Sequence, residues 1–130
     1  MPELRSNLKK SRGLALIFAE ANHARIHAGL TLACGSAALG RRVRMFFQAE
    51  AVCALQAERR WGGDATFVAA GMPTISDLIQ SALELGVGIM ACPTGLHMCA
   101  MAPAALDERI ESAGMVAFLA DAKGDDIVMP

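Results

Sequence analysis

Cysteine is the residue type in this sequence with the widest choice of chemistry, and four copies are present, Cys34, Cys53, Cys92 and Cys99. A cysteine can act as a nucleophilic thiolate, bind a metal or form a disulfide. Cys92 and Cys99 share the stretch GIMACPTGLHMCAM, residues 88–101. The chemistry of this stretch depends on whether the two side chains form a pair, act separately or pack in a core.

Cys92 directly follows VGIMAC, an apolar run of strand length over residues 87–92. If Pro93 takes the first helical position, where its missing N–H costs nothing, Cys92 is the N-cap residue. The free backbone N–H groups of Thr94 and Gly95 are then expected to point toward its sulfur. This geometry favours a thiolate, and it would hold a persulfide, R–S–S⁻, in the same way. The sequence therefore favours nucleophilic or sulfur-carrying chemistry at Cys92.

Packing is the alternative for every cysteine, since this residue type is among the most often buried. Cys34 and Cys53 stand among alanines and leucines in helix patterns, and both are predicted to be core residues. Cys99 follows Cys92 by seven residues, which is about 10 Å along a regular helix. A disulfide joins Cα atoms within roughly 7 Å, so a direct Cys92–Cys99 bond requires the turn to unwind. We expect Cys99 to pack in a core or interface, with a resolving cysteine as the alternative.

No metal site is expected from the spacing of the histidines and cysteines. His97 and Cys99 are near Cys92, and His23 and His27 are four residues apart, but neither set has the spacing of a structural zinc site. The histidine pair is interpreted as a partly exposed helix edge. The glycine-rich phosphate-binding motifs and the G-x-S-x-G motif are absent. No cofactor is therefore predicted.

The composition restricts the class of protein. With 130 residues, the chain is predicted to form one domain. Apolar residues make up 54% and charged residues only 19%, so we expect another subunit to cover part of the surface. A net charge of −1 without a large basic patch argues against nucleic-acid binding.

Neither a membrane span nor secretion is predicted. No apolar run approaches the roughly 18–20 residues of a span. Basic residues precede GLALIFAEA near the start, as in a signal peptide, but Glu20 interrupts this short run. We interpret residues 1–11 as a basic, flexible tail before a buried strand. A cytoplasmic location with free thiols is expected.

The apolar runs alternate with helical patterns. Strands are predicted over residues 13–19, 43–48, 87–92 and 126–129, and helices over 22–40, 50–60, 74–85 and 113–123. Residues 65–71 are interpreted as an extra strand or a packed loop. Unbroken apolar strands are typical of a parallel sheet covered on both faces. The fold class is therefore α/β, a three-layer α/β/α sandwich with a mostly parallel sheet of four to five strands.

Three stretches together resemble the DsrE/TusD (DsrE/DsrF-like) family of small sulfur-relay proteins, and the likeness covers nearly the whole chain. They are TISDLIQSALELGVGIMACPTGLHMC (74–99), RMFFQAEAV (44–52) and GMVAFLADAKGDDIVM (114–129). The family pattern is a helix ending in ELGV, an apolar strand, and a cysteine that opens a Met-rich helical turn. Two positions differ from the pattern: Cys99 replaces a commonly apolar residue, and Ala100 stands where glycine is expected.

The resemblance implies a single DsrE-like domain that carries sulfur and assembles as a trimer or hexamer. Cys92 matches the family's sulfur-accepting cysteine, which takes a sulfane sulfur from a donor protein and passes it to an acceptor. Such relays serve tRNA thiolation or sulfur oxidation.

Three functional hypotheses follow. The first is a sulfurtransferase-like persulfide carrier with Cys92 as nucleophile, Thr94 and Gly95 as supporting donors and His97 as a proton shuttle. The second is a non-catalytic oligomeric interaction module of the same fold. The third is a thiol redox sensor that uses Cys92 and Cys99.

Overall fold

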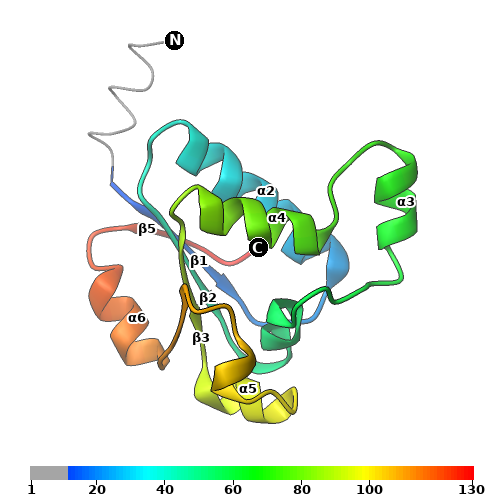
Figure 1. Cartoon of the computed structure of the whole chain (residues 1–130). Helices are drawn as coiled ribbons and strands as arrows, with labels where there is room; N and C mark the ends of the chain where they lie inside the picture. Colours follow the sequence, from blue (N-terminus) through cyan, green and yellow to red (C-terminus); the bar gives the residue numbers. More distant parts are fainter. Residues whose placement is uncertain (1–11) are drawn as a thin grey trace.

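The computed structural model describes residues 12–130, which contain one five-stranded sheet whose strands all pair in parallel (Figure 1). The strand order is β4-β3-β2-β1-β5. The strands are β1 (Leu14–Phe18), β2 (Val43–Phe47), β3 (Gly88–Ala91), β4 (Ile110–Ser112) and β5 (Asp126–Val128). The carboxyl ends of β2 and β3 therefore lie side by side at one edge of the sheet.

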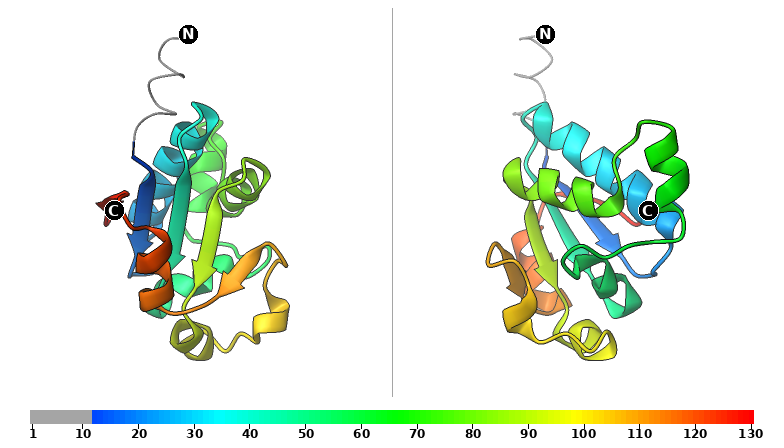
Figure 2. Two further views of the ribbon diagram at one scale, coloured as in Figure 1. Left: turned by 90° about the vertical axis from the view of Figure 1, so that its left-hand side faces the viewer. Right: turned by 45° about the vertical axis from the view of Figure 1, so that its right-hand side comes forward.

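Helices cover both faces of the sheet, which confirms the predicted α/β/α layers (Figure 2). Alternate residues of each strand point to opposite faces. Leu16 and Met45 pack in the larger apolar cluster with α2 (His23–Ala38) and α4 (Ile75–Glu84). Phe46 packs on the other face with Phe118 of α6 (Met115–Asp121).

The four predicted strands are confirmed, and the fifth, β4, is one that the sequence pattern missed. β1 is buried at every residue, as an unbroken apolar run predicts. β4 has only three residues, and only Ile110 among them is buried. A strand this short at the edge of a sheet has no apolar run to mark it.

The helix before β3 begins and ends where the sequence predicts. Thr74 caps α4, its hydroxyl accepts from the Asp77 N–H at 3.1 Å, and the Asp77 carboxylate accepts from the Thr74 N–H at 3.0 Å. Gly86 follows the helix with φ 80°, a left-handed conformation that favours glycine. Because α4 ends here, Val87 comes directly before β3.

Two segments differ from the predicted elements. Residues 65–71 form neither a strand nor a loop, because α3 (Asp64–Ala69) is a helix, although none of its residues is fully buried. The predicted helix at 50–60 is the 3₁₀ helix η1 (Ala49–Leu55). The remaining helices are α5 (Pro93–Met98) and the 3₁₀ turn η2 (Pro103–Ala105). The basic tail expected over residues 1–11 lies outside the described residues.

Within residues 12–130, no helix has both the length and the apolar character needed to cross a membrane.

Candidate functional site

Cys92 lies at the carboxyl end of β3 and is the N-cap residue of α5, as the sequence predicts. Pro93 occupies the first turn of that helix. The Cys92 N–H donates to the Phe47 carbonyl at 2.9 Å, which ties the residue to the end of β2. The thiol is free and half-buried, and Cys92 packs against the apolar cluster on the α6 face, as Ala113 and Met115 also do.

The supporting groups differ from the prediction. The Cys92 sulfur accepts no capping hydrogen bond, so the expected donation from Thr94 and Gly95 is not present. Gly95 is buried because it packs on η1, and an added Cβ would lie 2.9 Å from the Ala49 carbonyl oxygen. Thr94 and His97 are exposed. Among the hydrogen bonds of the described residues, none joins His97 to Cys92.

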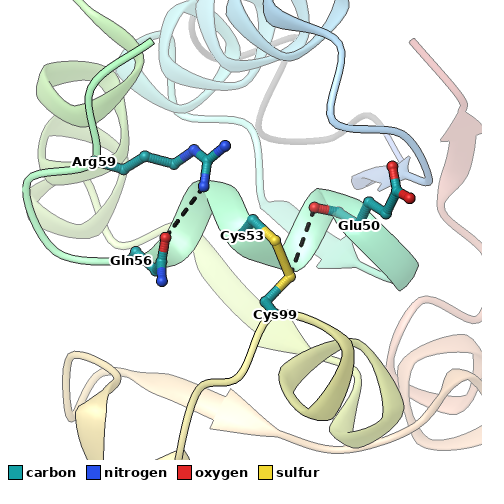
Figure 3. Close-up of a disulfide and its surroundings, with 5 residues drawn as sticks. All are labelled: Glu50, Cys53, Gln56, Arg59 and Cys99. Atoms are coloured by element: carbon teal, nitrogen blue, oxygen red, sulfur yellow. Dashed lines mark hydrogen bonds between the residues drawn. A yellow bond between two sulfur atoms is a disulfide. The ribbon is translucent and has the colours of Figure 1, made fainter.

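Cys99 forms a disulfide with Cys53 of η1, across 46 residues of sequence (Figure 3). The predictions that Cys53 is a core residue and that all four thiols are free are therefore wrong, as is the alternative in which Cys99 pairs with Cys92. Cys99 does pack against the larger apolar cluster, as expected, but as half of a disulfide. The sequence reasoning placed Cys99 two turns inside a regular helix, but α5 has six residues and Cys99 is its C-cap. The pair forms because η1 and α5 follow neighbouring parallel strands and meet at one edge of the sheet.

Cys92 and this disulfide pack against opposite faces of the sheet. Met90 and Cys92 are two residues apart, so both side chains face α6. Cys99 packs against the cluster on the opposite face. Strand alternation therefore sets the side of Cys92, and the course of α5 carries Cys99 to the opposite side, next to η1.

Cys34 is the second free thiol. It lies in α2 against the larger cluster, as predicted, and its thiol donates to the Leu78 carbonyl at 3.5 Å. Burial raises the pKa of the Cys34 thiol, which lowers its thiolate fraction at neutral pH. The structure therefore favours a packing role for Cys34.

The two histidines of α2 take part in a packed aromatic cluster. His27 is buried, and its Nε2 lies 2.8 Å from the Pro73 carbonyl oxygen, so this nitrogen is the donor. The Phe67 ring lies 4.1 Å from the His27 ring, and His23 pairs with Asp64 at 3.4 Å. The prediction of a partly exposed helix edge is wrong for His27, since α3 covers this part of α2.

A hollow of about 260 Å³ lies on the α6 face. Its lining includes Arg42, which precedes β2, together with Arg44 of β2, Gly88 and Met90 of β3 and Glu111 of β4. Cys92 lies at the carboxyl ends of these strands and is not among the lining residues. The chemistry of the candidate site therefore depends on the half-buried thiol and its apolar neighbours.

No known family model and no curated protein matches the sequence. Two solved structures share the fold. The ychN protein from E. coli has 16% sequence identity and a TM-score of 0.73, with 92% of this chain and 99% of that chain covered. MTH1491 from Methanobacterium thermoautotrophicum, a protein of unknown function, also has 16% identity, with a TM-score of 0.62 and 92% and 100% covered. Likeness at this identity shows the fold alone.

Proposed function

We propose that the protein is a sulfur carrier that holds a sulfane sulfur as a persulfide on Cys92 and transfers it to a partner protein. The observation that supports this proposal best is the position of Cys92, a free, half-buried thiol at the carboxyl end of β3. Sites of open parallel sheets gather at this edge. The resemblance to the DsrE/TusD family points to the same residue.

The proposed chemistry is an exchange at sulfur. The Cys92 thiolate attacks the outer sulfur of a donor persulfide, R–S–SH, and the donor leaves as the thiolate RS⁻. The product is a Cys92 persulfide, and the proton of the donor persulfide remains with it or passes to solvent. Attack by an acceptor thiolate on the outer sulfur then moves the sulfur on and restores the Cys92 thiolate. No cofactor takes part in these steps.

The test is mass spectrometry after incubation with a low-molecular-weight persulfide. The wild-type chain should gain about 32 Da, the mass of one sulfur atom, at Cys92. Cys92→Ser should lose this adduct, whereas the matched control Cys34→Ser should keep it. An adduct that stays in Cys92→Ser, or is absent from the wild type, would contradict the proposal.

An oligomeric interaction module is the second candidate. Exposed apolar side chains on the α6 side, Val116 at 84% and Ile127 at 52%, support it. We infer that copies of the chain assemble through this side, as a trimer or hexamer, in the cytoplasm. Intact oligomers in which Cys92 takes no sulfur would favour the module over the carrier. The redox sensor built on Cys92 and Cys99 is withdrawn, because Cys99 is bonded to Cys53.

A further inference from the structure

The Cys53–Cys99 bond holds the helix that begins at Cys92. It joins η1 to the C-cap residue of α5, with the two Cα atoms 5.4 Å apart (Figure 3). Both cysteines are half-buried rather than enclosed, so a small reductant has access to the bond. The Cys99 Sγ lies 3.9 Å from the Glu50 carbonyl oxygen, which could accept from the thiol after reduction. After reduction, the Cys99 thiol would therefore keep a polar contact with η1 through the Glu50 carbonyl.

The contact between α5 and η1 is close but locally strained. Gly95 leaves no room for a side chain against Val52 and Ala49. Two alanines take the left-handed conformation on either side of the disulfide, Ala49 at φ 49° and Ala100 at φ 53°. Such residues persist only when the surrounding structure holds them. A six-residue helix has little stability of its own, so α5 depends on its tertiary contacts, which are the buried Leu96, the packing of Gly95 on η1 and the disulfide.

We propose that Cys53 and Cys99 form a reversible redox site whose state sets the reactivity of Cys92 at the other end of α5. A low-molecular-weight disulfide, RSSR, oxidises the dithiol: two thiol protons are released, one S–S bond forms, and RSSR takes two electrons and two protons to become two RSH. Reduction by two RSH reverses each of these changes.

The coupling runs through a single short helix. The Leu96 N–H donates to the Cys92 carbonyl at 3.0 Å, and the Cys99 N–H donates to the Gly95 carbonyl at 3.0 Å. Cys92 is half-buried and packs against the apolar cluster on the α6 face, so a reagent reaches more of its sulfur when this packing opens. With the bond formed, both ends of α5 are held and opening is rare. With the bond reduced, the helix opens more often and Cys92 reacts faster.

The experiment measures the rate of Cys92 alkylation by iodoacetamide in a Cys34→Ser background, with peptide mass spectrometry to identify each site. Three forms are compared: the chain oxidised with a small-molecule disulfide, the same chain reduced and freed of reductant, and the variant Cys53→Ser/Cys99→Ser. We expect Cys92 to react several-fold more slowly in the oxidised chain than in the other two. The oxidised chain should also yield a Cys53–Cys99 linked peptide.

Equal Cys92 rates in the oxidised and reduced chains would overturn the proposal, as would the absence of the linked peptide. Circular dichroism follows folding in parallel. Loss of the folded signal on reduction would also overturn it, because the bond would then be needed for the fold rather than for control of Cys92. The comparison of the oxidised and reduced forms of the Cys34→Ser chain does not depend on the Cys53→Ser/Cys99→Ser variant.

This redox site does not require the sulfur-carrier function. Alkylation reports the accessibility of Cys92 whether or not the thiol accepts sulfur. A chain that takes no persulfide but shows redox-dependent alkylation would disprove the carrier and keep the redox site. A chain that accepts sulfur on Cys92 but is alkylated at equal rates in both redox states would disprove the redox site and keep the carrier.

Discussion

The face of the sheet toward which Cys92 points determines which groups its thiol can reach. Because Cys92 follows Met90 by two residues, its side chain faces α6 and packs against the same apolar cluster as Ala113 and Met115. Cys99, seven residues later, packs on the opposite face and bonds to Cys53. At the scale of single residues, the stretch 88–101 therefore contains one free thiol, Cys92, and one disulfide-bonded cysteine, Cys99.

Ala100 shows how a single residue ends α5. The Met101 N–H donates to the Leu96 carbonyl at 2.9 Å and the Ala100 N–H donates to the His97 carbonyl at 3.1 Å, which is a Schellman motif. Ala100 occupies the left-handed position of this motif, φ 53°, where glycine is usual. The resemblance to the DsrE/TusD family also led us to expect glycine here, and the backbone gives the physical reason.

We predict that Ala100→Gly stabilises the protein by up to about 1 kcal/mol, since glycine avoids the cost of the left-handed conformation. The matched control is Ala28→Gly, on the exposed side of α2, which should cost about 1 kcal/mol. Urea denaturation measures both free energies of unfolding. An equal loss of unfolding free energy in Ala100→Gly and Ala28→Gly would show that Ala100 carries no strain.

At the scale of elements, η1 and α5 form a unit at the carboxyl edge of β2 and β3. Gly95 allows the two helices to touch, because an added Cβ would lie 2.9 Å from the backbone oxygen of Ala49. The disulfide joins the same two elements. A change in this contact is therefore expected to move α5 and with it Cys92.

Gly95→Ala should destabilise the protein by about 1–3 kcal/mol, since the methyl group cannot be accommodated against η1 without a shift of backbone. Gly35→Ala is the control, because an added Cβ there meets nothing within 4 Å and the residue is exposed on α2. That substitution should gain roughly 0.5–1 kcal/mol. Thermal unfolding followed by circular dichroism distinguishes the two, and a neutral Gly95→Ala would contradict the close contact.

Reduction of the Cys53–Cys99 bond should lower the free energy of unfolding by about 2–4 kcal/mol, because a link across 46 residues restricts the unfolded chain. Urea titrations with and without a reductant measure this difference. Cys53→Ser/Cys99→Ser should show the reduced value under both conditions. A wild-type midpoint that does not respond to reductant would contradict the prediction.

At the scale of the whole molecule, the two faces of the sheet are covered unequally (Figure 2). α2 and α4 cover one face, whereas the seven-residue α6 packs on the other. On the α6 side, Val116 and Leu119 remain exposed, and so does Ile127, which is in register with Ala15 and shares its face. Large apolar side chains are also exposed elsewhere, among them Leu32 on α2 and Met98 on α5. The α6 side nevertheless includes the most exposed of them, Val116.

If copies of the chain assemble through this side, Val116→Asp should shift the oligomer toward monomer without loss of stability, since Val116 is 84% exposed in the single chain. Val68→Asp on α3, where Val68 is 60% exposed, is the matched control and should leave the mass unchanged. Size-exclusion chromatography with light scattering measures both masses. A wild-type monomer, or a Val116→Asp chain of unchanged oligomeric mass, would refute this interface.

Much of the fold could be predicted from the sequence because its signals are local. Apolar runs indicate the buried strands β1, β2 and β3 and the short, less buried β5, and Thr74 with Asp77 marks the start of α4. The N-cap position of Cys92 also follows from its neighbours, a buried strand before it and Pro93 after it. Secondary-structure propensity, helix capping and hydrophobic periodicity depend on residues close together in the chain, so all three can be evaluated from the sequence.

The disulfide, the face of Cys92 and the environment of His27 were decided by tertiary structure. Cys53 and Cys99 are 46 residues apart and meet only because β2 and β3 are neighbours in the sheet. His27 is buried because α3, whose short pattern indicated a strand or loop, is a helix whose Phe67 packs on its ring. These contacts join residues far apart in the chain, so their energy depends on the strand order and not on local sequence.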